Sequence, residues 1–211
     1  MKKKLSLFVL LIVAVICMSS CSIPIIGDFI QSDSSLGKTN NTAVTIADAM
    51  KGYLEGKNKE HFALYGMELI LNSDGNGTVK LYYTGALPEE AEYSDVYVAE
   101  VDSKTGHVER FGRADYAKDG LTPYRLVREG RAFDASSLPI DSGKATGVGV
   151  KAFSTDLDFH YDYVQMELSS SGSVEQYDIR FISMLNDAVY TCRVDAVSGS
   201  LLKSAKEPLE K

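Results

Sequence analysis

An internal repeat constrains the fold of this 211-residue chain more than any other feature of its sequence. The block HFALYGMEL at 61–69 aligns with HYDYVQMEL at 160–168, an offset of 99 residues (160 minus 61). The block YVAEVDSKTG at 97–106 aligns with YTCRVDAVSG at 190–199, an offset of 93 (190 minus 97). The difference falls in the polar segment 86–94, which is much shorter in the second copy. A deletion in a polar connection is typical of a duplicated unit, although two tyrosine-rich strands can also resemble each other by chance.

Hydropathy periodicity predicts the same succession in each half, one helix and then antiparallel strands. In the first half Thr45 can cap a helix, with Asp48 as its capping-box partner. The apolar stripe of this helix consists of Ile46, Ala49, Met50, Tyr53 and Leu54. The strands predicted after it span 61–71, 78–85, 95–102 and 107–111.

In the second half we expect a helix that begins near Asp141 or Ser142 and ends near Phe153. Glycines occupy positions 143, 147 and 149 of this segment, and each lowers the helix propensity by about 1 kcal/mol. The strands predicted after it span 159–169, 174–184, 188–195 and 200–204.

Each half closes on the same strand-turn-strand pattern. The two copies read Tyr97-x-x-x-Val101-Asp102-x-x-Thr105-Gly106-x-Val108 and Tyr190-x-x-x-Val194-Asp195-x-x-Ser198-Gly199-x-Leu201. In such a pattern the Asp side chain caps its own turn, and the Gly adopts the positive φ that a tight hairpin requires. We therefore predict a structural role for the six signature residues, which are Tyr97, Asp102, Gly106, Tyr190, Asp195 and Gly199.

This pattern resembles the closing signature of the PepSY domain, and the resemblance covers about residues 43–112 and 139–204. It implies an α+β fold of two similar units, each a helix packed on a small antiparallel β-sheet, as in PepSY and cystatin-like domains. It also implies that the protein is not an enzyme. PepSY domains occur in peptidase propeptides and in cell-envelope proteins, where they bind and restrain or assist another enzyme.

The N-terminus predicts export and a lipid anchor. Lysines at 2–4 precede an apolar run at 5–18, which is shorter than the roughly 20 residues that cross a bilayer. The next residues, Met18-Ser19-Ser20-Cys21, resemble the lipobox of bacterial lipoproteins. This resemblance implies a diacylglyceryl group, palmitate included, on Cys21, and attachment to the extracytoplasmic face of the cell membrane. An ordinary cleaved signal or an uncleaved anchor is the alternative.

The predicted organisation follows from these features. It consists of a lipoprotein signal peptide at 1–20, a tether at 21–42, a PepSY-like domain at 43–112, a linker at 113–138, a second PepSY-like domain at 139–204 and a C-terminal tail at 205–211. The tether is rich in Ser, Asn, Gly and Asp, as flexible linkers are. Its isoleucine-rich part at 23–30 can contact either the membrane interface or the folded body.

Charge and cysteine content exclude several classes of function. The formal net charge is −7, and it falls to about −10 when the three lysines of the signal peptide are removed. An acidic body without a basic stripe argues against a nucleic-acid partner and leaves the lipid as the contact with the membrane. Outside the signal and the lipobox, Cys192 is the remaining thiol, so no internal disulfide is expected. Its strand places it beside Tyr190 and Val194, which predicts a buried hydrophobe.

No catalytic, metal or cofactor site is predicted. His61, His107 and His160 are not grouped at the spacing of metal ligands. The segment 72–77 resembles the start of a calcium loop, but the twelfth position, which should be a bidentate Glu, is Tyr83. A hairpin turn is therefore the favoured interpretation of that segment.

The longer loop of the first repeat is the clearest difference between the two copies, and we predict a partner surface there, formed by Glu89, Glu90, Glu92 and Tyr93. The expected function is that of a lipid-anchored cell-envelope protein that binds and modulates an extracytoplasmic partner without catalysis. A peptidase is one candidate for the partner. The alternative is a lipoprotein that binds a small ligand or an envelope polymer.

Overall fold

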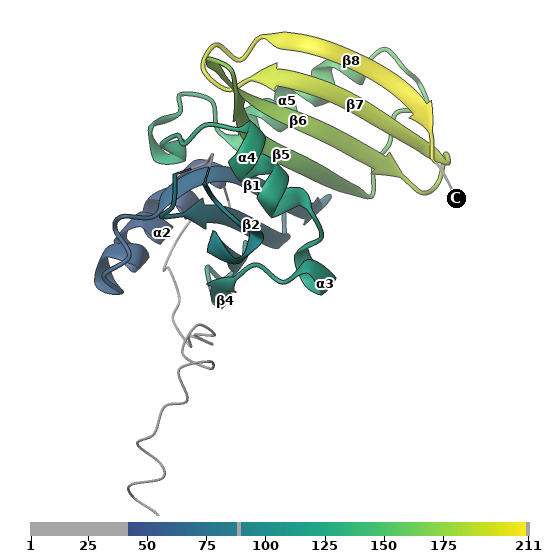
Figure 1. Cartoon of the computed structure of the whole chain (residues 1–211). Coiled ribbons are helices and arrows are strands. Elements are labelled where there is room, and N and C mark those ends of the chain that lie inside the picture. The colour runs from purple at the N-terminus through teal and green to yellow at the C-terminus, as the bar shows by residue number, and fades with distance from the viewer. Residues whose placement is uncertain (1–41, 88–89, 210–211) are drawn as a thin grey trace, which may run out of the picture.

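The computed structural model describes residues 42–87 and 90–209, so the predicted signal peptide, Cys21 and Glu89 lie outside the described residues. Within those ranges, eight strands form one antiparallel sheet with the order β4-β3-β2-β1-β5-β6-β7-β8 (Figure 1). In chain order the strands are β1 (Ala63–Asn72), β2 (Gly77–Thr84), β3 (Val96–Asp102), β4 (Val108–Arg113), β5 (Tyr163–Ser171), β6 (Val174–Ser183), β7 (Ala188–Asp195) and β8 (Leu201–Pro208).

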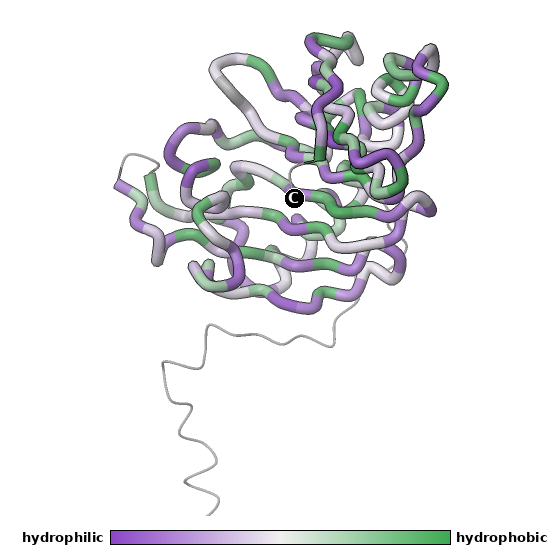
Figure 2. The backbone as a smooth tube through the Cα atoms, turned by 90° about the vertical axis from the view of Figure 1, so that its right-hand side faces the viewer, coloured by the Kyte–Doolittle hydropathy of each residue, from purple (hydrophilic) through white to green (hydrophobic). Residues whose placement is uncertain are grey.

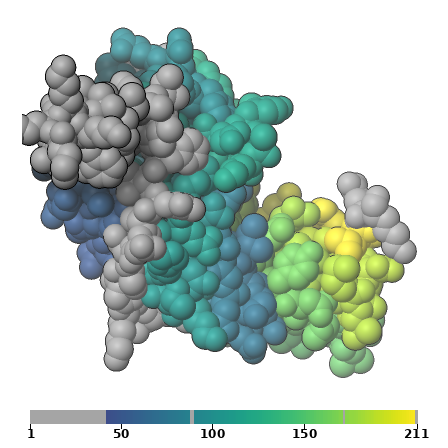
Figure 3. All heavy atoms as spheres, turned by 90° about the horizontal axis from the view of Figure 1, so that it is seen from below, coloured from purple at the N-terminus to yellow at the C-terminus, as the bar shows by residue number. Residues whose placement is uncertain are grey.

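The continuous sheet overturns the expected fold of two units, each a helix on its own small sheet. β1 pairs with β5 in antiparallel register, from Gly66 opposite Ser169 to Asn72 opposite Tyr163. Two separate units would leave the edges of β1 and β5 unpaired, and each edge would carry backbone N–H and C=O groups without partners. Pairing the two edges removes that cost, and the halves lie side by side in the space-filling view (Figure 3).

The junction between the halves is symmetric about the centre of the sheet. Glu68 lies opposite Glu167, its equivalent in the repeat, and Met67 lies opposite Leu168. A local two-fold axis therefore passes between the two glutamates. The same axis places two carboxylates next to each other on one face, where like charges at directly opposed positions destabilise a sheet unless other groups compensate.

One face of the sheet is covered by α2 (Ala43–Gly56) and α5 (Ser142–Phe153). Alternate residues of the strands point to this face, and the alternation of hydropathy can be followed along the chain in Figure 2. With the two helices they form one continuous core within the described residues, and its largest buried members include Met50, Met67, Leu81, Leu168, Ile179, Phe181 and Tyr190. This shared core is a second reason why the halves do not form separate units.

The helices begin at a shared cap. The Asp141 carboxylate accepts a hydrogen bond from the Ser142 backbone N–H at 2.6 Å, in α5, and one from the Val44 N–H at 3.4 Å, in α2. The Ser142 hydroxyl accepts a third bond from the Ala43 N–H at 3.0 Å. An N-cap carboxylate satisfies orphan N–H groups and favours the positive end of the helix dipole. Asp141 thereby joins the first turns of both helices.

The segment predicted as a linker, 113–138, is folded. It contains α3 (Tyr116–Asp119), α4 (Thr122–Glu129) and the 3₁₀ turn η2 (Ala135–Ser137), and a second 3₁₀ turn, η1 (Tyr93–Asp95), precedes β3. α4 packs Leu126 against the sheet over Gly66, where an added Cβ would lie 2.7 Å from Leu126 Cδ1. A Cβ at this position would push the Leu126 side chain aside, so glycine allows α4 to pack closely on β1.

Candidate functional site

The face of the sheet opposite α2 and α5, here called the α4 face, carries most of the charged strand residues. Over β1 to β4 it is covered by α3, α4 and the loop before β3, and α4 contacts β1, β2 and β3. Over β6 and β7 no described helix lies in front of the sheet, as Figure 1 shows. The α4 face thus has a covered part and an open part.

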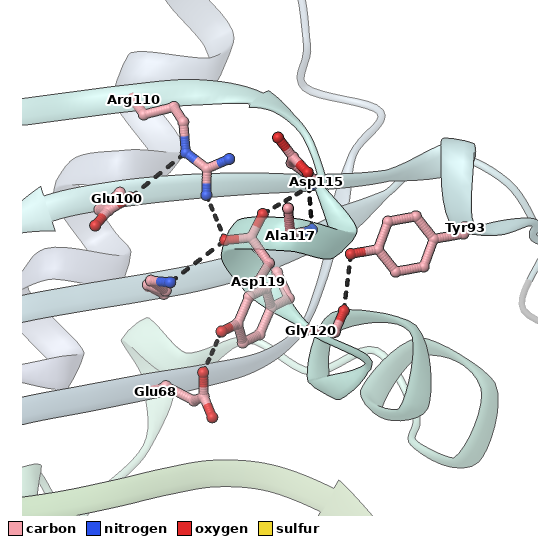
Figure 4. A network of polar contacts seen from close by, with 10 residues as sticks. Glu68, Tyr93, Glu100, Arg110, Asp115, Ala117, Asp119 and Gly120 are labelled. Carbon is pink, nitrogen blue, oxygen red and sulfur yellow. Dashed lines mark hydrogen bonds and ion pairs between the residues drawn. The ribbon is translucent and has the colours of Figure 1, made fainter.

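A buried network of charges lies beneath α3 in the covered part (Figure 4). The Asp119 carboxylate, whose side chain is fully buried, accepts a hydrogen bond from Arg110 Nη2 at 2.5 Å and lies 3.3 Å from Lys80 Nζ. Its other oxygen accepts the Asp115 backbone N–H at 2.9 Å. Arg110 Nε also lies 3.4 Å from the Glu100 carboxylate.

These contacts explain the protonation state of Asp119. Burial alone would raise the pKa of its carboxyl, but the hydrogen bonds from Arg110 and from the Asp115 N–H, together with the charge of Lys80, hold the pKa below its ordinary value. The carboxylate is enclosed and fully paired, so it has no access to a substrate. The network fastens α3 onto β2 and β4, which is a structural task.

The two central glutamates are compensated in different ways. Tyr82 donates its hydroxyl hydrogen bond to Glu68, and Arg125 of α4 forms an ion pair with Glu167. Burial, and after it the Glu68 carboxylate, raises the pKa of the Tyr82 phenol well above its ordinary value. Burial also raises the pKa of Glu167, and Arg125 opposes that shift. The repulsion expected from the opposed pair is thus relieved by one proton donor and one cation.

The open part begins beside this pair and is hollowed. A cavity of about 320 Å³ is lined by side chains of three strands, namely Glu68, Ile70, Gln165, Glu167, Asp178 and Arg180. Arg180 is exposed, and no described residue forms a hydrogen bond or an ion pair with it. Its cross-strand neighbours are the uncharged Gln165 and Thr191, and Ile70 is 48% exposed nearby. This arrangement presents one free guanidinium beside apolar surface.

In the acidic loop of the first repeat, the residues predicted to form a partner surface differ in their exposure. Glu90 and Glu92 are exposed, as a partner surface requires, whereas Tyr93 is half-buried. The Tyr93 hydroxyl donates to the Gly120 carbonyl at 2.8 Å, and its ring lies near those of Tyr116 and Tyr124. Tyr93 therefore joins the loop to α3 and α4, and the prediction for the glutamates stays a prediction.

The signature residues form the two hairpin turns that close each half. Asp102 Oδ1 accepts the Thr105 N–H at 2.7 Å, and the φ of Gly106 is 67°. Asp195 Oδ1 accepts the Ser198 N–H at 2.6 Å, and the φ of Gly199 is 74°. The Thr105 hydroxyl also donates to Asp102 Oδ1 at 2.7 Å, and this bond, followed by the one from the Thr105 N–H, lowers the pKa of Asp102. The N–H groups of Ser198 and Val197 lower the pKa of Asp195.

The two signature tyrosines point to the helix-covered face but differ in burial. Tyr190 is fully buried against Phe153 and Phe159, whereas Tyr97 is half-buried and stacks on Phe62, with 4.7 Å between ring centroids. They therefore belong to the packing of the core side.

Other candidate residues are dispersed. Cys192 is buried, and burial, with a smaller effect of Asp178, raises the pKa of its thiol to about 11. A thiol of that pKa is almost entirely protonated at neutral pH. Among residues 42–87 and 90–209 no group of three His, Cys, Asp or Glu side chains could hold a metal ion. In the same part of the chain no helix has the length and apolar character needed to cross a membrane.

Sequence reasoning missed the open part of the α4 face. The alternation in β6 places Asp178 and Arg180 on the face opposite Ile179 and Phe181, and this signal was present in the sequence. The neighbours of Arg180 across β5 and β1 depend on the junction between the halves. They could not be deduced without it.

Comparisons with known proteins leave the function to be argued from this site. No protein-family model matches the chain, and no curated protein matches it. A crystal structure of a candidate lipoprotein from Clostridium difficile 630 aligns over 85% of this chain and 99% of its own, with 13% identity and a TM-score of 0.49. The YpeB C-terminal domain from Bacillus megaterium aligns over 84% and 70%, with 14% identity and a TM-score of 0.26. At these TM-scores neither similarity assigns a family or an activity.

Proposed function

We propose that this chain is a lipid-anchored bacterial envelope protein that binds and modulates an extracytoplasmic protein without catalysis of its own. The anchor rests on the lipobox-like sequence at Cys21, which lies outside the described residues. The observation that carries the binding role is the free guanidinium of Arg180 at the open part of the α4 face. The PepSY resemblance of the sequence implies a peptidase as one class of partner.

The composition of the open part supports a protein partner. Arginine is enriched at protein interfaces, because its planar group binds carboxylates and its stem covers apolar surface. Arg180 and Ile70 line the same hollow on either side of Gln165, so a partner could place an acidic group and an apolar side chain in it. Asp178 is paired with Arg193 at 2.7 Å, and Glu167 is paired with Arg125. Glu68, the third carboxylate of the hollow, accepts the Tyr82 hydroxyl, and among the described residues no ion pair joins Arg180 to any of the three.

The anchor would strengthen such an interaction. Tethering a binding surface near the membrane raises its effective concentration toward a partner on the same membrane, without any new contact. A weak docking surface of modest area can then suffice.

Site-specific crosslinking on intact cells tests this proposal. A photoreactive amino acid at position 180 should crosslink one envelope protein, whereas the same probe at Lys104, an exposed residue of the turn after β3, should not. Arg180→Ala should weaken co-purification of that protein about tenfold, and Lys104→Ala should leave it unchanged. Equal crosslinking from both positions, or an unaltered yield with Arg180→Ala, would contradict the proposal.

A further inference from the structure

A second cavity lies on the other face of the sheet, beneath α2. Its volume is about 410 Å³, within the range of roughly 300–1,000 Å³ that is usual for small-molecule sites. Its walls come from α2, from the start of β1, from β2 and from the segment that leads into η2. This cavity, here called the α2 pocket, is separated from Arg180 by the sheet.

The interior of the α2 pocket is mainly apolar. Ala47 and Leu54 line it from α2, Leu64 and Phe62 from the first-strand side, and Phe133 from the later segment. The backbone N–H of Phe133 donates to the Leu64 carbonyl at 3.0 Å, so this wall is fixed to the start of β1. Apolar walls of this kind accept an apolar body.

Tyr83 supplies the polar group of the interior. Its side chain is only 4% exposed and lines the pocket, and no described residue makes a hydrogen bond with its hydroxyl. Tyr82, the preceding residue, differs because its hydroxyl donates to Glu68 on the other face. The Tyr83 hydroxyl is not one of the fully enclosed polar atoms without a partner, so it opens onto the pocket and a ligand acceptor can reach it. The apolar surroundings strengthen a hydrogen bond formed there, so a group that accepts it gains binding free energy.

The mouth of the pocket is acidic. Glu55, Glu60 and Asp134 line it together with Lys51, which lies 3.3 Å from Asp134 and links α2 to the segment before α5. Both members of this ion pair are about half exposed, so they screen the opening without sealing it. The Lys59 ammonium lies next to this lining, 5.2 Å from the centre of the Phe62 ring. The three carboxylates outnumber Lys51 and Lys59 by one charge, and this formal excess disfavours anionic ligands.

We propose that the α2 pocket binds a small, uncharged or cationic molecule with an apolar body and one hydrogen-bond acceptor, and that the acceptor pairs with the Tyr83 hydroxyl. The site is independent of the protein partner proposed above, because it lies on the opposite face. Failure of either proposal leaves the other standing.

Matched aromatic probes test the inference on the unlipidated chain that begins at residue 21 and carries Cys21→Ser. The ketone 2-acetonaphthone has an apolar body and one acceptor, whereas 2-ethylnaphthalene has the same body without the acceptor. Fluorescence titration should show that the ketone binds about fivefold more tightly, which is the usual effect of one buried hydrogen bond. The anion 2-naphthoate should bind more weakly than the ketone.

Two variants and one control locate the site. Tyr83→Phe should abolish the preference for the ketone, and Ala47→Leu should fill the pocket and weaken both probes. Tyr116→Phe, which alters an exposed tyrosine on α3, should change neither affinity. Circular dichroism melts of each variant separate loss of folding from loss of binding, and methyl NMR shifts at Leu54 and Leu64 report where the probe lies.

The proposal is overturned if both probes bind equally, if Tyr83→Phe retains the preference, or if shifts appear away from the pocket. Absence of binding by all three probes, with a folded protein, also overturns it.

Discussion

Helix α5 contains three glycines, and their surroundings predict opposite effects of the same substitution. Gly143 and Gly147 are exposed, and an added Cβ at either would meet no atom within 4 Å. Gly149 is buried against β6 and β7, and its added Cβ would lie 2.7 Å from Phe181 Cε2 and 2.8 Å from Cys192 Sγ. Real Cβ atoms essentially never approach other atoms below 3.0 Å, so the neighbours must move.

The size of each effect follows from these contacts. Gly147→Ala should stabilise the fold by about 0.5–1 kcal/mol, because alanine has the higher helix propensity and the site is open. Gly149→Ala gains the same propensity but overpacks the core, at a cost of about 3 kcal/mol, the upper end of the usual range. We choose the upper end because both Phe181 and Cys192 are buried and cannot swing aside. The net loss is about 2 kcal/mol.

Urea unfolding followed by far-UV circular dichroism, under reducing conditions, measures both changes. In a domain of this size about 1 kcal/mol corresponds to roughly 2–4 °C in Tm, so thermal melts give a second readout. The double variant Gly149→Ala/Cys192→Ala should lose less stability than the two single variants lose together, since removing Sγ makes room for the new methyl group. If Gly149→Ala stabilises the protein as much as Gly147→Ala does, the packing argument is wrong.

Two further substitutions test polar contacts. Asp141→Ala should lower the free energy of unfolding in urea by about 1–2 kcal/mol, because its one carboxylate caps two helices. The control Asp115→Ala removes the cap of α3 alone and should cost less. An equal loss in the two variants would refute the shared cap. Asp119→Asn should cost about 3–5 kcal/mol, because it removes the nearer of the two carboxylates that pair with the buried Arg110 and leaves only Glu100 at 3.4 Å. Since the folded-state pKa of Asp119 is lowered, its contribution is present above about pH 4 and is lost as the pH falls through the lowered value. The stability gap between wild type and Asp119→Asn should therefore narrow on acidification below about pH 4, and a gap that widens would refute the assignment.

Local structure was largely predictable from the sequence. Both helices, α2 and α5, were expected within a few residues of their observed bounds, and each predicted strand overlaps an observed one. The strands were predictable because the alternation of hydropathy indicates which face of each strand is buried. α5 was readable despite its glycines, since Asp141 provides a cap and the apolar spacing survives. The burial of Cys192 followed from the same alternation.

The connection 113–138 shows where such reasoning stops. Its short helices bury few residues, and the α4 stripe of Leu126 and Val127 is too brief to indicate a helix by period alone. Its role depends on Gly66, which lies far away in the chain and makes room for Leu126. The burial of Arg110 likewise depends on α3, which packs over β4 and pairs Asp119 with the guanidinium.

By itself, then, the sequence indicated the two similar halves, the two helices, the strands and their turns, together with the lipobox-like segment that ends at Cys21, because these depend on spacing between near neighbours in the chain. Only the tertiary structure decided that β1 joins β5, which merges the halves, within the described residues, into one sheet with a shared main core beneath α2 and α5. That pairing brings Ile70 beside Gln165 and Arg180. Hydropathy indicates which face of a strand is buried but not which strand pairs with its edge. The open part of the α4 face therefore could not be predicted without the tertiary structure.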